Sequence, residues 1–250
     1  MLRLGRTLAI MSLAVCTASC VMAEILPDLR SVDSLQAARA AEEKGDLARA
    51  HRDYATAAMN YQKALRFDGQ NSKLLNKLGI AQLKLENRGA ARRSFNQAIK
   101  YDPRNTTALN NLGALCLLDK KYKQALRYLK EALALDESSA SAHLNIAGVW
   151  MGLNEIDRAM TEYSRAFELN PDLMQDDGNG LAAQVRTPEQ RARISYLIAK
   201  AYAKRGNLDG ALDYLRRAKD DRFPRLSDVY KDQEFASLWA DPRLAKIIKR

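Results

Sequence analysis

The sequence is poor in the residues that usually build metal sites and disulfide scaffolds. Its 250 residues include only 2 His and 3 Cys, which leaves little material for a metal site and excludes a disulfide framework. There are 12 Gly, 6 Pro and 7% aromatic residues, too few turn residues for a sandwich or barrel of many short strands. Hydrophobic residues at 47% and charged residues at 28% indicate a folded chain with a sizeable core, neither disordered nor polytopic.

The segment 1–23 has the pattern of a secretory signal peptide. Arg3 and Arg6 precede an apolar stretch, and Val21-Met22-Ala23 places small residues at the two positions that signal peptidase reads. The sequence thus predicts an exported protein, periplasmic or secreted, that begins at Glu24 and continues through a linker over residues 24–34.

A second interpretation of the same segment makes Cys20 the site of a lipid anchor. Ala18-Ser19-Cys20 has the small residues that such a site needs, whereas Thr17 stands where a larger aliphatic residue is usual. Lipidation at Cys20 would tether the protein to a membrane, and the sequence predicts no other membrane contact. Cleavage after Ala23 instead leaves Cys116 as the single cysteine, so the fold must be stabilised by packing.

Small residues recur at one fixed interval along most of the remaining chain. The small residues form three series. In each series four members are separated by the same interval, the distance from Gly45 to Gly79, and a fifth member follows after an insertion. A fixed period of about 20–50 residues is the sequence signature of a repeat protein. The series are Gly45, Gly79, Gly113, Ala147 and Ala199; Ala57, Ala91, Ala125, Ala159 and Ala211; and Ala64, Ala98, Ala132, Ala166 and Ala218.

Each period predicts two helices joined by a short polar turn. Apolar residues follow helical spacing, as at Leu75 and Leu78 in one run and at Phe95 and Ile99 in the next. The small residues allow the helices to approach closely, and the larger residues fill the space between them. Because one hairpin cannot bury its apolar face alone, neighbouring hairpins must stack and share a core.

This pattern resembles the tetratricopeptide repeat. The resemblance implies an all-α fold, a right-handed superhelix or solenoid of helical hairpins, with an array over residues 35–173. Its repeats would be 38–71, 72–105, 106–139 and 140–173, and a further repeat would follow at 192–225. The first helix of repeat 38–71 is degenerate, and its frame stays open because Gly45-Asp46-Leu47 also imitates a turn between helices. The matching residues of the two clearest repeats are Leu75, Leu78, Gly79, Ala91, Phe95, Ala98 and Pro103, and then Leu109, Leu112, Gly113, Ala125, Leu129 and Ala132.

Two segments fall outside the predicted repeats. Residues 174–191 predict an acidic insertion loop, since Asp176-Asp177-Gly178-Asn179-Gly180 lacks the first and last ligands of a calcium loop. Residues 226–250 predict two short amphipathic helices, over residues 231–239 and 242–248, that cap the open end of the solenoid. Four apolar side chains of that segment are expected to face inward: Phe235, Leu238, Trp239 and Leu244.

No group of residues indicates an active site. His51 and His143 fall on predicted repeat helices without Cys, Asp or Glu at ligand spacing, and Cys116 lies between two leucines with no basic neighbour in its turn. The sequence has no phosphate-binding Gly loop, no nucleophile elbow and no zinc-protease helix. We therefore expect no enzymatic activity, no cofactor and no metal.

The resemblance places ligand contacts on the concave face, which the first helix of each repeat lines. Asn111 and Asn145 fall at equivalent positions of two repeats, and a side-chain amide both donates and accepts hydrogen bonds, so stacked Asn could grip a peptide backbone of any sequence. The simpler explanation is that Asn is common at this position in the family. The candidate contact residues are Lys73, Asn76, Lys77, Lys84, Asn110, Asn111 and Asn145.

The charge is distributed in bands along the chain. The formal net charge is +10, yet residues 72–130 carry 13 basic and 3 acidic side chains, whereas residues 131–190 carry 3 basic and 11 acidic ones. Residues 191–250 are again basic, with 15 basic and 8 acidic side chains. In a solenoid these segments become successive bands of potential, which could set the register of a bound acidic segment or simply be solvated outer faces.

The leading hypothesis is a non-enzymatic scaffold or adaptor that binds a protein or peptide segment in the concave groove, with the lysines attracting an acidic portion. The alternative is a membrane-tethered lipoprotein that acts as an assembly factor for pilus or outer-membrane machinery. Nucleic acid is not an expected partner, because the chain is predicted to be exported and its basic band lacks aromatic residues spaced to stack bases. The identity of the partner and the oligomeric state stay open.

Overall fold

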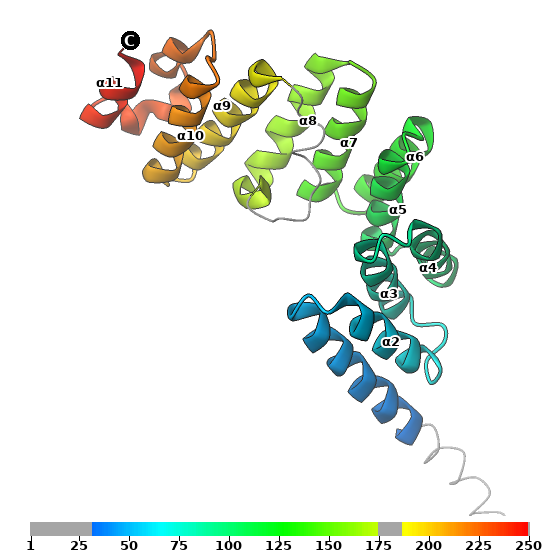
Figure 1. Cartoon of the computed structure of the whole chain (residues 1–250). Helices are drawn as coiled ribbons and strands as arrows, with labels where there is room; N and C mark the ends of the chain where they lie inside the picture. Colours follow the sequence, from blue (N-terminus) through cyan, green and yellow to red (C-terminus); the bar gives the residue numbers. More distant parts are fainter. Residues whose placement is uncertain (1–31, 175–186, 250) are drawn as a thin grey trace, which may run out of the picture. The chain divides into compact units, whose positions relative to one another are not determined.

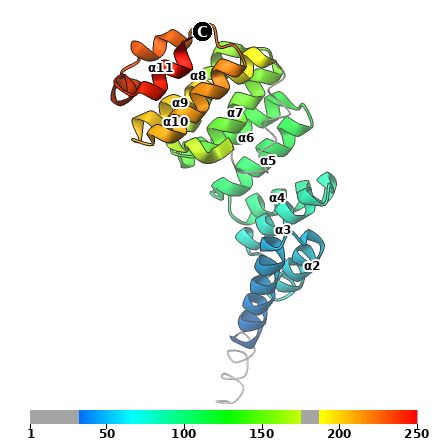
Figure 2. The same ribbon diagram turned by 60° about the vertical axis from the view of Figure 1, so that its left-hand side comes forward.

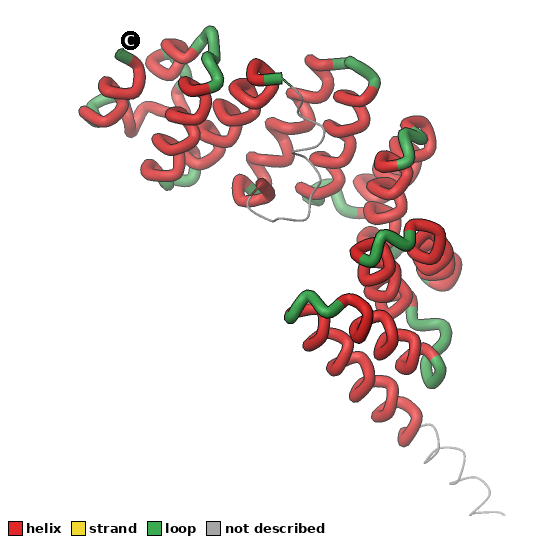
Figure 3. Tube along the Cα trace, in the orientation of Figure 1, coloured by secondary structure: helices red, strands yellow, loops and turns green. Residues whose placement is uncertain are grey.

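The computed structural model describes residues 32–174 and 187–249, and all regular structure in these ranges is helical (Figure 3). No helix within these ranges combines the length and the apolar character that a membrane crossing needs. The signal peptide, Cys20 and Asp176-Asp177-Gly178-Asn179-Gly180 lie outside the described residues. The chain divides into two compact units, one ending at Pro103 and the other beginning at Arg104, and each is described by itself.

The first unit contains a helix over residues 32–50, then α2 (Tyr54–Leu65), α3 (Ser72–Lys84) and α4 (Arg88–Tyr101) (Figure 1). The first helix includes Gly45-Asp46-Leu47, so this tripeptide is not the turn that it imitates. It also includes residues 32–34, so the predicted linker 24–34 is wrong at its C-terminal end. The turn lies at residues 51–53, so His51 is in the turn and not on a helix.

The described residues of the second unit form three hairpins and a C-terminal cap (Figure 2). The α9 helix begins at Pro188, before the repeat predicted from residue 192 and inside the predicted loop 174–191, because Thr187 forms a capping box with Gln190. The hairpins are α5 (Thr106–Leu118) with α6 (Tyr122–Leu135), α7 (Ala140–Gly152) with α8 (Ile156–Leu169), and α9 (Pro188–Lys204) with α10 (Leu208–Asp220); a short 3-10 helix, η1 (Pro171–Met174), follows α8.

The three series of small residues form the centre of each hairpin. All fifteen members are buried, and each glycine of the first series lies against a large side chain of the partner helix. A Cβ built on Gly79 would lie 2.4 Å from Cε1 of Phe95, and one built on Gly45 would lie 2.6 Å from Cε1 of Tyr61. These positions therefore need small residues so that the two helices can pack closely.

The turn inside each hairpin repeats with the same period. Arg52, Glu86, Lys120, Asn154 and Gly206 all have positive φ, between 57° and 76°, and they follow the spacing of the small residues. Only the last of them is glycine, the residue that adopts this backbone conformation without strain. The next residue in each turn is the N-cap of the second helix, and Asp53, Asn87 and Asn207 accept a hydrogen bond there from a backbone N–H.

The C-terminal segment caps the last hairpin but is built differently from the prediction. In place of a helix over residues 231–239 it has two 3-10 helices, η3 (Leu226–Tyr230) and η4 (Gln233–Leu238), followed by α11 (Pro242–Ile248). Phe235, Leu238 and Leu244 are fully buried as expected. Trp239 is 38% exposed, which corrects the expectation that it faces inward, because its Nε1 donates a 2.8 Å hydrogen bond to the carbonyl of Val229 at the rim of the cap.

Candidate functional site

In the first unit, the candidate Lys77 is held by acidic side chains of the preceding helix. Its Nζ lies 2.7 Å from Oε1 of Glu42 and 2.6 Å from Oδ2 of Asp46, and Tyr61 donates a 2.8 Å hydrogen bond to the other oxygen of Asp46. The Lys77 side chain is 29% exposed. This cluster of four residues joins the first helix to α2 and α3.

Burial and hydrogen bonding act in opposite directions on the charges of this cluster. Burial disfavours the charged form of Asp46, but hydrogen bonds from Lys77 and Tyr61 outweigh it and hold the pKa of Asp46 below its usual value of 3.8. Burial likewise opposes the charge on Lys77, and its hydrogen bonds to Asp46 and Glu42 outweigh this and raise the pKa of Lys77. Burial, reinforced by the hydrogen bond to Asp46, raises the pKa of Tyr61 to about 12.

Two of the four candidates in the first unit remain available to a partner. Lys77 is already paired with Glu42 and Asp46 inside its own unit, and Asn76 is buried at 7% exposure. Lys73 and Lys84 are exposed, and neither forms an ion pair with a described residue.

In the second unit, two asparagines form a side-chain pair between neighbouring first helices. Nδ2 of Asn145 on α7 donates a 3.0 Å hydrogen bond to Oδ1 of Asn110 on α5, and both side chains are partly buried. By sequence, Asn145 and Asn111 occupy equivalent repeat positions. The structure joins Asn145 to the residue 35 before it instead, the same offset that joins Lys77 to Glu42.

The asparagine pair keeps hydrogen-bonding groups for a ligand. The Asn145 amide oxygen and the Asn110 amide nitrogen form no hydrogen bond with a described residue, and an extended backbone offers donors and acceptors that match them. The pair is thus suited to main-chain recognition, which does not depend on the sequence of the bound segment.

The remaining candidates for chemistry have structural roles. Nδ1 of His143 on α7 lies 2.7 Å from Oε2 of Glu162 on α8, and His143 lines an open pocket of about 280 Å³ with Leu133, Glu137 and Arg165. Cys116 is buried in the core of its hairpin. Among the described residues, no three His, Cys, Asp or Glu side chains gather into a possible metal site.

Comparison with known proteins assigns the repeats to a family. Two family profiles, both described as tetratricopeptide repeat, match the sequence, one at residues 76–140 and 180–225 and the other at residues 116–185. The chain belongs to the tetratricopeptide repeat family. Proteins of this family are generally non-catalytic scaffolds for protein interactions, and a role in protein interaction follows for this chain.

Solved structures show the same tetratricopeptide repeat fold. A thermophilic protein of this family from Thermus thermophilus, TTC0263, is 22% identical with a TM-score of 0.53, over 84% of this chain and 98% of its own. PilF of Pseudomonas aeruginosa is 18% identical with a TM-score of 0.55, over 82% of this chain and 90% of its own. MamA of Desulfovibrio magneticus RS-1 is 16% identical with a TM-score of 0.52, over 73% of this chain and 93% of its own. No curated protein matches the sequence significantly.

The cluster around Lys77 is the part of the site that sequence reasoning missed. Glu42 and Asp46 lie in the helix whose frame the sequence left open, so their distance from Lys77 was not predictable. The structure shows an offset of 35 residues between contacting side chains of neighbouring first helices, which joins Glu42 to Lys77 in one unit and Asn110 to Asn145 in the other.

Proposed function

We propose that this tetratricopeptide repeat protein is a non-enzymatic adaptor that binds an extended segment of a partner protein along its first helices. The observation that carries the proposal is the hydrogen-bonded pair of Asn110 and Asn145 on α5 and α7. Each amide is fixed by the other, so little side-chain freedom is lost when a ligand binds, and the remaining amide groups pair with its main chain.

In the first unit, acidic residues of a partner protein are attracted by Lys73 and Lys84, which are exposed and form no ion pair with a described residue. Lys77 has a different role, since its charge is already neutralised by Glu42 and Asp46. Exposed charges of this kind increase the association rate and select between partners more than they add affinity.

The test is peptide selection against the purified mature protein, followed by affinity measurements on two variants. We expect Asn145→Ala to weaken the selected peptides about tenfold, equivalent to about 1.4 kcal/mol. Asn96→Ala, an exposed asparagine on α4, is the matched control and should bind as the wild type does. Equal binding by both variants would remove the asparagine pair from the proposal, and failure to select any peptide would remove the adaptor function.

The sequence supports a second candidate, a membrane-tethered lipoprotein that serves as an assembly factor for pilus or outer-membrane machinery. It rests on Ala18-Ser19-Cys20, while the signal peptide supports export to the periplasm or beyond. Metabolic labelling with a fatty acid separates the two. Label that is present in the wild type and absent in Cys20→Ala supports the anchor, and an unlabelled protein that begins at Glu24 supports simple export.

A further inference from the structure

The outer face of α6 carries a row of cations with about one in each turn. Lys123, Arg127 and Lys130 are all exposed, and their spacing of four and three residues places them on one face of the helix. With the exposed Lys120, in the turn before α6, and Lys121, the N-cap residue, they form what we call the basic stripe. Glu131 is the single acidic residue within α6.

None of the five cations is neutralised by an ion pair with a described residue. The closest contact is that of the Arg127 guanidinium, which lies 4.2 Å from the centre of the Tyr128 ring. In this the basic stripe differs from Lys77 in the other unit, which has two carboxylates within hydrogen-bonding distance.

The repeat fold does not require cations at these positions. The equivalent residues of the α7–α8 hairpin, in the same unit, are Asn154, Asp157, Thr161 and Ser164. Those of the α9–α10 hairpin are Gly206, Asp209, Asp213 and Arg216. Three hairpins therefore share the packing, and only one of them presents a row of cations at these places.

Lys120 and Lys121 of the basic stripe occupy turn positions that glycine and asparagine, respectively, would stabilise better. Lys120 has a φ of 57° where the last hairpin has Gly206, and a residue with a Cβ is strained in this region. Lys121 makes no side-chain capping bond, whereas Asn87 and Asn207 cap the equivalent helices. Lysine at these two places therefore leaves the start of α6 less stable than glycine and asparagine would. Other hairpins share part of this cost, since Asn154 also has positive φ and Glu155 makes no capping bond to α8.

We propose that the basic stripe binds an acidic helix of a partner protein, laid along α6 with one carboxylate in each turn. Both helices then share the same pitch of about 5.4 Å, so each cation meets a carboxylate in register. This surface is separate from the asparagine pair, which lies between the first helices α5 and α7, and it does not depend on the proposed groove.

The composition of the face argues against two other anionic partners. A helix that binds a bilayer inserts apolar side chains, and no large exposed apolar residue lies between Lys120 and Lys130. Nucleic acid bound as a single strand needs free aromatic faces, and Tyr128 is half-buried and covered by Arg127.

The experiment measures binding of two synthetic helical peptides to the full mature chain by fluorescence anisotropy at low and physiological salt. One peptide has four glutamates on a single face, and the other has the same composition with the glutamates spread around the helix. We expect the first to bind at least tenfold more tightly, and we expect Lys123→Glu together with Arg127→Glu to abolish this preference. Lys63→Glu, an exposed cation on α2 in the other unit, is the control and should leave the preference unchanged, which shows that the loss is specific to the basic stripe.

A second pair of variants distinguishes a binding role from a structural one. Lys120→Gly and Lys121→Asn should each raise the melting temperature and yet weaken the one-faced peptide severalfold. The proposal is overturned if both peptides bind equally, if neither binds, or if vesicles containing phosphatidylglycerol or duplex DNA bind more tightly than the one-faced peptide.

Discussion

At the scale of single residues, two tyrosines at equivalent repeat positions differ in what their hydroxyl groups contact. Tyr61 donates a 2.8 Å hydrogen bond to Asp46, whereas the hydroxyl of Tyr163 is fully buried and has no hydrogen-bond partner among the described residues. Phe95 occupies the equivalent position in another hairpin and is also fully buried. Leaving a buried hydroxyl unsatisfied costs about 1–3 kcal/mol.

We therefore expect Tyr163→Phe to leave the free energy of unfolding unchanged or to raise it by about 1 kcal/mol. Tyr61→Phe, the matched change, should lower it by about 1 kcal/mol because Asp46 loses a donor. Urea unfolding of both variants checks the pair. A clear loss of stability in Tyr163→Phe would contradict the assignment and would mean that the hydroxyl has a partner beyond the described residues.

The Asp46–Lys77 contact predicts a pH dependence confined to the acid range. The pKa of Asp46 is lower in the folded state than its usual value of 3.8, because its hydrogen bonds outweigh the effect of burial. Its contribution to stability is then fully present above about pH 4 and is lost as the pH falls through the folded-state pKa.

Asp46→Asn should accordingly destabilise the protein at pH 7 and have a smaller effect at pH 3, because the stabilisation that comes with the lowered pKa is lost as the pH falls below the usual value. The loss at pH 7 should be modest, about 1 kcal/mol or less, since the side chain is 37% exposed. Chemical unfolding at the two pH values measures the difference. A destabilisation that is the same at both values would show that the charge of Asp46 does not contribute.

At the scale of secondary-structure elements, α6 begins less favourably than α4 and α10, and in this it resembles α8. Asn87 and Asn207 cap α4 and α10 through their side chains, and Lys121 provides no such bond to α6. We expect Lys121→Asn to stabilise the protein by about 1 kcal/mol and Asn87→Ala to destabilise it by a similar amount. Thermal unfolding of the two variants tests this. An unchanged melting temperature for Lys121→Asn would show that the start of α6 is satisfied in another way.

Much of the helical architecture could be predicted from the sequence, because packing positions repeat with the period of the fold. The small residues at Gly79 and Ala91, and the large one at Phe95, are buried as that period predicts. The turn residues repeat too, but Arg52, Glu86 and Lys120 have no chemistry in common, so their shared backbone conformation was not visible. A turn position that needs positive φ can be recognised in a sequence when glycine occupies it, but not when other residue types do.

The candidate contacts were less predictable than the helices. Sequence placed Asn111 and Asn145 at equivalent positions, but neighbouring first helices meet with an offset of 35 residues, and the hydrogen bond joins Asn145 to Asn110. A register shift of one residue is too small for a packing pattern to fix, yet it decides which side chains touch. The same limit concealed the partners of Lys77.

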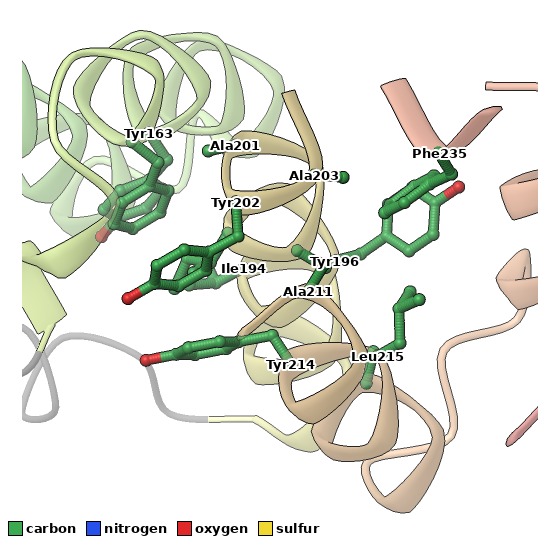
Figure 4. Close-up of a cluster of buried hydrophobic side chains, with 14 of the residues drawn as sticks. Tyr163, Ile194, Tyr196, Ala201, Tyr202, Ala203, Ala211, Tyr214, Leu215 and Phe235 are labelled. Atoms are coloured by element: carbon green, nitrogen blue, oxygen red, sulfur yellow. The ribbon is translucent and has the colours of Figure 1, made fainter. Parts of the chain in front are cut away.

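At the scale of the whole molecule, the C-terminal segment replaces the next hairpin of the array. Phe235 packs against Tyr196 of α9, with ring centres 5.5 Å apart (Figure 4), and Asp232 accepts a 2.9 Å hydrogen bond from the hydroxyl of Tyr196. The separation of 36 between Tyr196 and Asp232 is close to the offset of 35 that joins neighbouring first helices. The C-terminal segment therefore covers α9, the first helix of the final hairpin, much as another repeat would, although it is built mainly from 3-10 turns.

Because the C-terminal cap packs on α9 through the buried ring of Phe235, we expect a substitution at this one residue to lower the free energy of unfolding strongly. Phe235 is fully buried, so Phe235→Ala should lower the free energy of unfolding by about 3–5 kcal/mol. Trp239→Phe is the comparison within the same cap, and it should cost only about 1 kcal/mol because the indole is 38% exposed and loses mainly its hydrogen bond to Val229. Urea unfolding followed by circular dichroism measures both. If Phe235→Ala costs no more than Trp239→Phe, the cap does not seal the core, and the apolar face of α9 must be stabilised by the helix packing within its own hairpin.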